Sequence, residues 1–400
     1  MHHAKPVLAA DSPSGWRGRR FGIVSTFPPT PCGIATFSAA LAEGLIGRGA
    51  TVEVVRCGTA TESHRSLVTA SLSGNVGDAG RAVDVLDGTD AVIVQHEYGI
   101  FGGDDGEAIL PLVEAVTAPI IVVAHTVLKE PSVHQHSVLR RVCGAADAVV
   151  VMTESARTGL LDGFGVDPSK VLLIPHGAAQ LDDPLRATDR TERLPLGLDG
   201  DRVPTLLTWG LLGPGKGIEW AVDAVASLDD LDPRPHYIVA GATHPKVRAR
   251  SGESYRSMLQ DRACRSGAAP LVSFDDGYRD LAALAGLISS SDLVVLPYDS
   301  RDQVTSGVLV DAVAAGRPVV STAFPHAVEL LATGAGLVVP QRDPVALAGA
   351  IRRALTEPGL LDAMAAEARR LAPELSWNAV AGRYARLAER LLASTQAVSA

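Results

Sequence analysis

The stretch DQVTSGVLVDAVAAGRPVVST, residues 302–322, combines a polar turn, a short apolar helix, a glycine and a buried strand. We expect the helix to begin at Thr305, Ser306 and Gly307. The first N–H groups of a helix lack intrahelical partners and carry the positive end of its dipole, so this glycine-bearing start suits an anion such as phosphate. Ser306 is also a good N-cap residue, and a capped helix that binds nothing is the alternative interpretation.

A second candidate for anion binding is the glycine-rich loop LLGPGKG, residues 211–217, which follows an apolar run. Glycine allows the backbone to approach a ligand closely, and the ammonium group of Lys216 beside Gly215 could reach phosphate oxygens. The alternative is an ordinary surface lysine that precedes a helix.

Three side chains that could bind a sugar follow an apolar run in the first half of the chain. His96, Glu97 and Tyr98 offer a base, an acid and an aromatic platform for a sugar ring. We interpret them as an acceptor site, and a structural hydrogen-bonded pair is the alternative. His125, at the end of the next apolar run, could exchange a hydrogen bond with a sugar hydroxyl or be a satisfied buried histidine.

Continuous apolar runs precede most of these loops. They cover residues 21–26, 51–55, 91–97, 120–126, 148–153, 171–177, 205–210, 236–242, 271–277, 292–298, 317–322 and 336–340. Strands buried on both faces have this pattern, which predicts parallel sheets covered by helices, for example over residues 36–45 and 134–143. We therefore predict an α/β protein with two doubly wound Rossmann-like domains that face a cleft at the carboxyl ends of their strands.

The composition and charge of the chain argue against several classes of function. The 400 residues are 46% apolar, enough for two cores, and the net charge of −9 gives no support for nucleic-acid binding. The four cysteines are scattered without zinc or redox spacing, and no apolar run approaches the length of a membrane span. We expect a cytoplasmic protein with at most peripheral membrane contact at the inner face.

The order of the motifs resembles the retaining GT-B glycosyltransferases of family GT4. The resemblance extends from Phe21 to Trp377 and rests on Gly33 after the first strand, "AHT", "IPHGA", "GPGKG" and the helix that precedes "AAGRPVV". It implies an N-terminal tail (1–20), an acceptor-side domain (21–180), a linker (181–203) and a nucleotide-sugar domain (204–376). It also implies a final helix, 377–400, that returns to the first domain.

The resemblance also implies roles for individual residues. The E-x7-E motif of the family falls on Gln303 and Asp311, so Gln303 would orient the sugar without charge and Asp311 would accept hydrogen bonds from ribose. Lys216 matches the lysine that binds the diphosphate, whereas Leu211 replaces the usual arginine. The other expected donor-binding residues are Gly33, Gly215, His244, Thr305, Ser306 and Gly307, and His125 is expected to face the donor sugar.

The expected reaction transfers a hexose, such as mannose or glucose, from a nucleotide diphosphate sugar to a hydroxyl of a sugar, glycoside or lipid-linked acceptor with retention. Lys216, His125 and Gln303 would be its catalytic residues. Lys246 or Arg301 could supply the cation missing at Leu211. No D-x-D motif predicts a metal site, so no obligatory metal is expected. A non-catalytic subunit that binds nucleotide sugars and a nucleotide-sugar 2-epimerase are the alternatives.

Overall fold

The computed structural model describes residues 18–30, 32–58, 67–74, 77–178, 202–277, 281–300 and 305–399. Most of the expected N-terminal tail and of the linker, together with Arg301 and Gln303, lies outside the described residues. Two separate parallel sheets organise the rest of the chain, as the continuous apolar runs predict.

The first sheet has seven strands in the order β3-β2-β1-β4-β5-β6-β7. The strand pairs with resolved register are parallel, and the order reverses between β1 and β4, as in a doubly wound sheet. The strands are β1 Arg20–Ser25, β2 Thr51–Cys57, β3 Val68–Leu72, β4 Ala91–His96, β5 Ile120–Ala124, β6 Ala148–Val151 and β7 Val171–Leu173.

Helical segments connect these strands, and a long helix ends the chain. They are α1 Gly33–Gly47, α2 Asp78–Asp87, η1 Asp104–Ile109, α3 Leu110–Ala115, α4 Val133–Ala145, α5 Glu154–Thr158, η2 Gly159–Gly163 and, at the end, α14 Trp377–Ser399. Ser132 caps α4 in a capping box with Gln135, which explains why this helix begins where it does.

The second sheet has six strands in the order β10-β9-β8-β11-β12-β13. Its resolved pairs are parallel, and its order reverses between β8 and β11. The strands are β8 Thr205–Trp209, β9 His236–Ala240, β10 Val272–Asp275, β11 Leu293–Leu296, β12 Val319–Thr322 and β13 Gly336–Val339.

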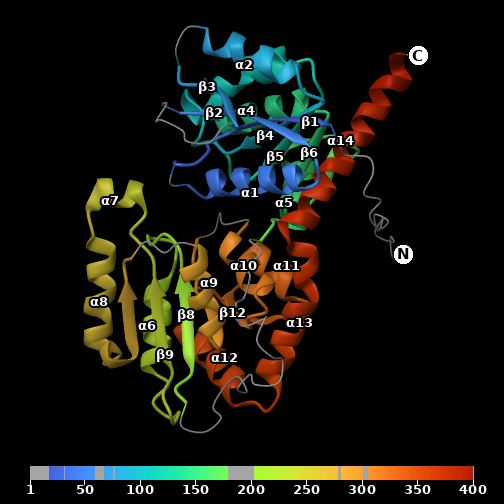
Figure 1. Ribbon diagram of the computed structural model, residues 1–400. Helices are drawn as coiled ribbons and strands as arrows, with labels where there is room; N and C mark the ends of the chain where they lie inside the picture. The colour runs from blue at the N-terminus through green and yellow to red at the C-terminus, as the bar shows by residue number, and fades with distance from the viewer. Residues whose placement is uncertain are drawn as a thin grey trace. The chain divides into compact units, whose positions relative to one another are not determined.

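Helices cover both faces of this second sheet (Figure 1). They are α6 Ile218–Ala226, α7 Pro245–Ser251, α8 Ser254–Ser266, η4 Ala269–Leu271, α9 Leu281–Ser290, α10 Gly307–Ala314, α11 Pro325–Leu331, α12 Pro344–Thr356 and α13 Leu360–Leu375. Leu206 packs in a core with α6, α8 and α12, whereas the next residue, Leu207, packs in a second core with α10 and α11. Because successive strand residues face opposite sides, two covered faces require an unbroken apolar run.

The chain forms two compact units. Unit 1 contains the described residues up to Ala124, Ser132–Val150 and the chain from Val380 onward. Unit 2 contains His125–Pro131 and Val151–Ala379. The last helix therefore begins in unit 2 and continues in unit 1, where Gly382 lies against the guanidinium group of Arg48.

Several elements differ from the sequence-based expectation. Strand β3 was not expected, because it lies at the edge of the sheet, where Ala70 is the one buried residue of VTASL. Strand β7 ends at Leu173, well before Gly177, since Pro175 cannot donate a ladder hydrogen bond. Helix α1 begins at Gly33, three residues earlier than the apolar pattern indicates.

The burial of α14 in unit 1 leads to a stability prediction. Tyr384 is fully buried on this helix, so Tyr384→Ala leaves a cavity and should lower the free energy of unfolding by about 3–5 kcal/mol. Urea unfolding followed by circular dichroism measures the change. Arg390→Ala, an exposed site on the same helix, is the control and should change stability by less than about 0.5 kcal/mol. Equal effects of the two variants would contradict the packing.

Candidate functional site

The loop after β8 lies directly on the segment after β11 in unit 2. The carbonyl oxygen of Gly215 accepts hydrogen bonds from the backbone N–H groups of Asp299 (3.1 Å) and Ser300 (3.3 Å). Gly217 has a φ of +62°, and a Cβ there would lie 1.9 Å from the carbonyl oxygen of Pro297. Only glycine meets both demands, so Gly217 allows the two segments to dock.

Lys216, between these two glycines, extends over an aromatic ring. Its Nζ lies 4.3 Å from the ring centroid of Tyr298, within the range of a cation–π interaction. Tyr298 is 1% exposed and stacks on Phe324, with ring centroids 5.2 Å apart. The expected diphosphate lysine therefore belongs to an ordered loop at the carboxyl end of the sheet.

Helix α10 begins where the sequence predicts. Ser306 is its N-cap, and its Oγ accepts a hydrogen bond from the Leu309 N–H at 3.2 Å. The backbone N–H of Ser306 donates to Nδ1 of His326 at 3.1 Å. Capping is thus part of what Ser306 does, and its role toward an anion stays a prediction.

A histidine from a distant part of the sequence lies against Gly307. A Cβ at this position would be 3.2 Å from both Cε1 and Nε2 of His176, so a side chain would displace the imidazole. Nδ1 of His176 donates a hydrogen bond to the Gly177 carbonyl oxygen at 2.6 Å. We expected glycine at 307 only for the sake of a phosphate; the imidazole of His176 is a reason that sequence reasoning missed.

Both imidazoles beside the start of α10 are neutral at physiological pH. Burial lowers the pKa of His176 to about 4 and that of His326 to about 3, and the neighbouring His176 lowers the latter further. A neutral Nδ1 can accept the Ser306 N–H, whereas a protonated one could not.

The loops after β8 and β9 run side by side. The Leu212 N–H donates to the Ala242 carbonyl oxygen (2.9 Å), and the His244 N–H donates to the Leu212 carbonyl oxygen (2.8 Å). Burial lowers the pKa of His244, and so do the positive charges of Lys246 and Lys216. The ammonium groups of Lys246 and Lys216 therefore make the surroundings of His244 positive, whereas Leu211 contributes no charge.

Asp311 lies in the second turn of α10 and is half-buried. Thr305 precedes the N-cap residue and is half-buried as well. The structure thus places Gly215, Lys216, His244, Thr305, Ser306, Gly307 and Asp311 on unit 2, at or near the carboxyl ends of its strands.

The expected acceptor residues form a cluster in unit 1 at the carboxyl end of β4. His96 is fully buried, and neither of its ring nitrogens has a hydrogen-bond partner in the described part of the chain. Its ring meets Tyr98 edge-on, with centroids 5.2 Å apart, and the Tyr98 hydroxyl also lacks a partner among the described residues. Buried polar atoms normally have partners, so these three atoms are candidates for contacts with a polar ligand.

In the part of the chain that the structure describes, the other residues that we expected in unit 1 or at its boundary show no comparable cluster of buried polar atoms without partners. The Glu97 carboxylate accepts a hydrogen bond from the Tyr98 N–H at 3.0 Å. His125 follows β5 and is half-buried. Gly33 begins α1, whose N-cap residue, Cys32, makes no side-chain capping hydrogen bond. Burial lowers the pKa of His96 to about 4, which keeps this imidazole neutral.

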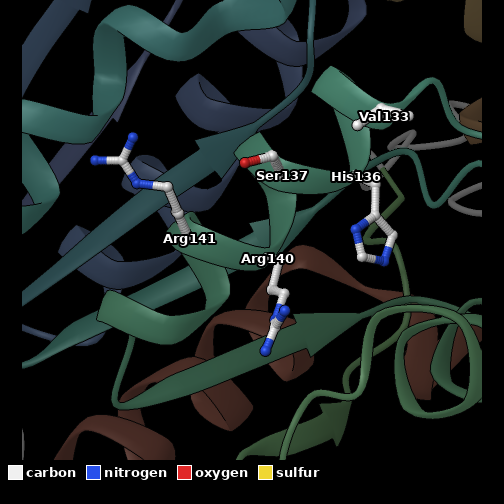
Figure 2. A pocket seen from close by; sticks show the side chains of 5 residues that line it. All are labelled: Val133, His136, Ser137, Arg140 and Arg141. Atoms are coloured by element: carbon white, nitrogen blue, oxygen red, sulfur yellow. The ribbon is translucent and has the colours of Figure 1, made fainter.

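A pocket on α4 contains none of the residues that we expected to bind donor or acceptor. Its lining residues are Val133, His136, Ser137, Arg140 and Arg141 (Figure 2). Val133 is 90% exposed, and the guanidinium group of Arg141 pairs with Glu114 at 2.6 Å. Figure 2 shows Arg140 and Arg141 pointing in different directions, so their charges do not converge on one point.

The described residues contain no group of three or more His, Cys, Asp or Glu side chains that could hold a metal ion. Among the helices described, none combines the length and the apolar character that crossing a membrane requires.

Family models match both halves of the chain. The model described as Glycosyltransferase Family 4 matches residues 31–179, and the model described as Glycosyl transferases group 1 matches residues 203–357. The chain is 31% identical over 264 residues to D-inositol 3-phosphate glycosyltransferase of Kineococcus radiotolerans, covering 60% of this chain and 57% of that protein. It is 27% identical to the same-named protein of Corynebacterium glutamicum, covering 67% and 66%. The match thus spans little more than half of the first relative.

Solved structures share the fold over nearly the whole chain. Sucrose-phosphate synthase from Thermosynechococcus elongatus has a TM-score of 0.71 at 19% identity and covers 94% of this chain and 100% of that one. HepE from Anabaena, in complex with UDP, has a TM-score of 0.67 at 16% identity and covers 93% and 100%. These similarities confirm the expected fold of two Rossmann-like domains.

The buried imidazoles predict an acid-sensitive stability. The folded-state pKa values of His96, His176 and His326 lie below the ordinary value of 6.5, so at acidic pH the unfolded chain binds more protons. Their contribution is complete above pH 6.5 and is lost as the pH falls towards about 4, or about 3 for His326, with a slope of up to ~1.4 kcal/mol per pH unit for each group. His326→Gln removes one of these imidazoles. The melting temperature of this variant should therefore fall less steeply than that of the wild type as the pH is lowered.

The control for this prediction is His134, whose pKa is raised because its Nδ1 contacts the Asp105 carboxylate at 2.9 Å. Its contribution to stability is present below pH 6.5 and is lost as the pH rises. His134→Gln should therefore not reduce the fall of the melting temperature at acidic pH. Identical acid profiles of the wild type and His326→Gln would contradict the prediction.

Proposed function

Because the chain belongs to the GT-B glycosyltransferases of family GT4, we propose that it transfers a hexose from a nucleotide diphosphate sugar to a hydroxyl acceptor with retention of anomeric configuration. The observation that carries this proposal is the position of Lys216 in unit 2. Its ammonium group belongs to a glycine loop docked on the segment after β11, at the carboxyl end of a doubly wound sheet where such folds bind nucleotides.

The proposed donor site uses the positive charge of unit 2. Lys216 and the backbone amides of Ser306 and Gly307 would stabilise the leaving diphosphate as charge develops on it. Lys246, whose charge is felt at His244 together with that of Lys216, would supply the second cation that Leu211 lacks. Asp311 would accept hydrogen bonds from the ribose hydroxyls.

The proposed donor is UDP-glucose or another nucleotide diphosphate hexose. UDP is bound by the structurally similar HepE, which supports a uridine donor as the first to test. GDP-mannose and ADP-glucose are the other candidates, because the residues named above would contact phosphate and ribose groups that all three donors share. His125 and Gln303 would orient the sugar.

The proposed acceptor is a polyol, sugar or cyclitol, with or without a phosphate group. The unpartnered nitrogens of His96 and the Tyr98 hydroxyl could bind its hydroxyl groups, and the Tyr98 ring offers an apolar face to the sugar. The relatives are named for D-inositol 3-phosphate, so this compound is the first acceptor to test.

In the proposed reaction the bond between the anomeric carbon and the diphosphate oxygen breaks. The acceptor oxygen bonds to the same face of the anomeric carbon, and its proton passes to the leaving phosphate oxygen. This route needs no protein base at the reacting carbon, which agrees with an uncharged amide at Gln303.

The experiment that tests the function has two stages. Thermal shift with UDP-, GDP- and ADP-sugars identifies the donor, since a ligand that binds only the folded state raises the melting temperature. Proton NMR of the product formed with an acceptor panel then identifies the anomer. An inverted anomer would contradict retention, an epimerised donor without acceptor would indicate a 2-epimerase, and binding without turnover would indicate a non-catalytic subunit.

Lys216→Ala should lower kcat far more than it lowers stability. The side chain is half-buried and touches the Tyr298 ring, yet its main effect should be on the transition state, where losing one such donor costs about 3 kcal/mol. Initial rates with saturating donor and acceptor measure kcat. Lys170→Ala is the control, because it also removes a lysine but one that is not among the proposed donor-site residues. A near wild-type kcat for Lys216→Ala would contradict the assignment.

His96→Phe should raise the KM for the acceptor without weakening donor binding. The substitution keeps an aromatic ring but removes both nitrogens, so the acceptor loses hydrogen bonds and the KM should rise at least about fivefold. Stability should not fall, because the nitrogens have no partners in the described chain. Kinetics with varied acceptor and titration with UDP separate the two effects, and an unchanged acceptor KM would contradict the acceptor site.

A further inference from the structure

The ammonium group of Lys216 has an aromatic neighbour that the reaction described above does not use. Its Nζ lies 4.3 Å from the ring centroid of Tyr298. We propose that Tyr298 is a positioning residue of the donor site, whose ring face holds the Lys216 ammonium where it meets the diphosphate of the donor. The inference rests on the proposed function, because it concerns the same site.

Tyr298 can serve as a fixed platform because its ring and its backbone are both held. The ring is 1% exposed and stacks on Phe324, itself fully buried, at an interplanar angle of 28°. The Tyr298 carbonyl oxygen accepts hydrogen bonds from Thr322 Oγ1 and from Gln341 Nε2. A ring held on both sides loses little entropy when a cation packs on it.

The backbone of Lys216 is anchored to the same segment. The Gly215 carbonyl oxygen is bonded by the N–H groups of Asp299 and Ser300, and Gly217 packs on the carbonyl oxygen of Pro297. The segment 297–300 therefore fixes the loop at its two glycines and the lysine side chain at its tip. The same short segment therefore positions both the backbone and the ammonium group of Lys216.

An aromatic ring holds a cation without neutralising it. In the part of the chain that the structure describes, no carboxylate forms an ion pair with Lys216. The nearest carboxylate in sequence to the ring is Asp299, which accepts from Arg342 Nε (3.2 Å) and Trp220 Nε1 (3.3 Å) instead. The described carboxylates thus leave the charge of Lys216 available to an incoming anion, whereas an ion pair would have to be broken first.

The ring, and not the hydroxyl, carries this role. The Tyr298 hydroxyl is buried without a hydrogen-bond partner in the described chain. Phenylalanine keeps the ring face and removes only this unpartnered group, whereas leucine keeps apolar volume but has no π-electrons. The pair Tyr298→Phe and Tyr298→Leu therefore separates cation–π positioning from simple packing.

The experiment measures binding of UDP by isothermal titration and kcat with the donor found in the thermal-shift screen. Tyr298→Phe should bind UDP within about twofold of the wild type, and Tyr298→Leu should bind at least about fivefold more weakly, the range expected for losing one cation–π contact. Lys216→Ala and the double variant Lys216→Ala/Tyr298→Leu complete a double-mutant cycle. If Tyr298 acts through Lys216, the leucine substitution should have little further effect once the lysine is absent.

Tyr384→Ala is the control for stability. It removes a fully buried ring on α14 in unit 1, whereas Lys216 and Tyr298 lie in unit 2, so it should lower the melting temperature while leaving UDP affinity nearly unchanged. Wild-type affinity in Tyr298→Leu, equal losses in Tyr298→Phe and Tyr298→Leu, or additive effects in the cycle would overturn the inference. These outcomes differ from failure of the proposed function, in which the wild type and all variants bind no UDP-, GDP- or ADP-sugar.

Discussion

The close approach of Gly217 to the Pro297 carbonyl oxygen is the constraint on which the candidate donor site depends. A Cβ at Gly217 would lie 1.9 Å from this oxygen, so any other residue would separate the loop after β8 from the segment after β11. These strands pair in parallel, and their carboxyl ends therefore deliver both segments to the same edge. Farther along the chain, residues 305–306 lead into α10, whose start carries the other candidate groups of the donor site.

The charges of unit 2 follow a consistent pattern. The groups closest to the start of α10 are imidazoles whose pKa values are lowered to about 4 and about 3, so they add no positive charge there. His326 instead accepts the Ser306 N–H, which satisfies one amide at the end of the helix where amides lack partners. Positive charge comes instead from Lys216 and Lys246, whose charges both act on His244. Burial thus keeps the imidazoles beside the helix start neutral, and the two lysines supply the cations.

Much of the fold was predictable because its determinants are local. A strand covered on both faces must be apolar at every position, and the runs at Leu206–Leu207 and Val294–Val295 show this directly. The start of α10 was predictable from Ser306, since a capping side chain acts on an amide three residues away. Strand β3 escaped prediction because it lies at the edge of the sheet: Val68 and Ser71 are only half-buried, so the requirement for an unbroken apolar run is weaker.

The sequence by itself determined the two α/β sheets, the family and the residues that stand at strand ends. Only the tertiary structure decided which of these residues meet. His176 lies against Gly307, and Tyr298 lies beneath Lys216, although neither pair is close in the chain and neither contact has a periodic or capping signal. Burial patterns and caps act over a few residues and leave a trace in the sequence, whereas a contact between two loops depends on how a whole sheet orders its strands. That order is a property of the packed chain.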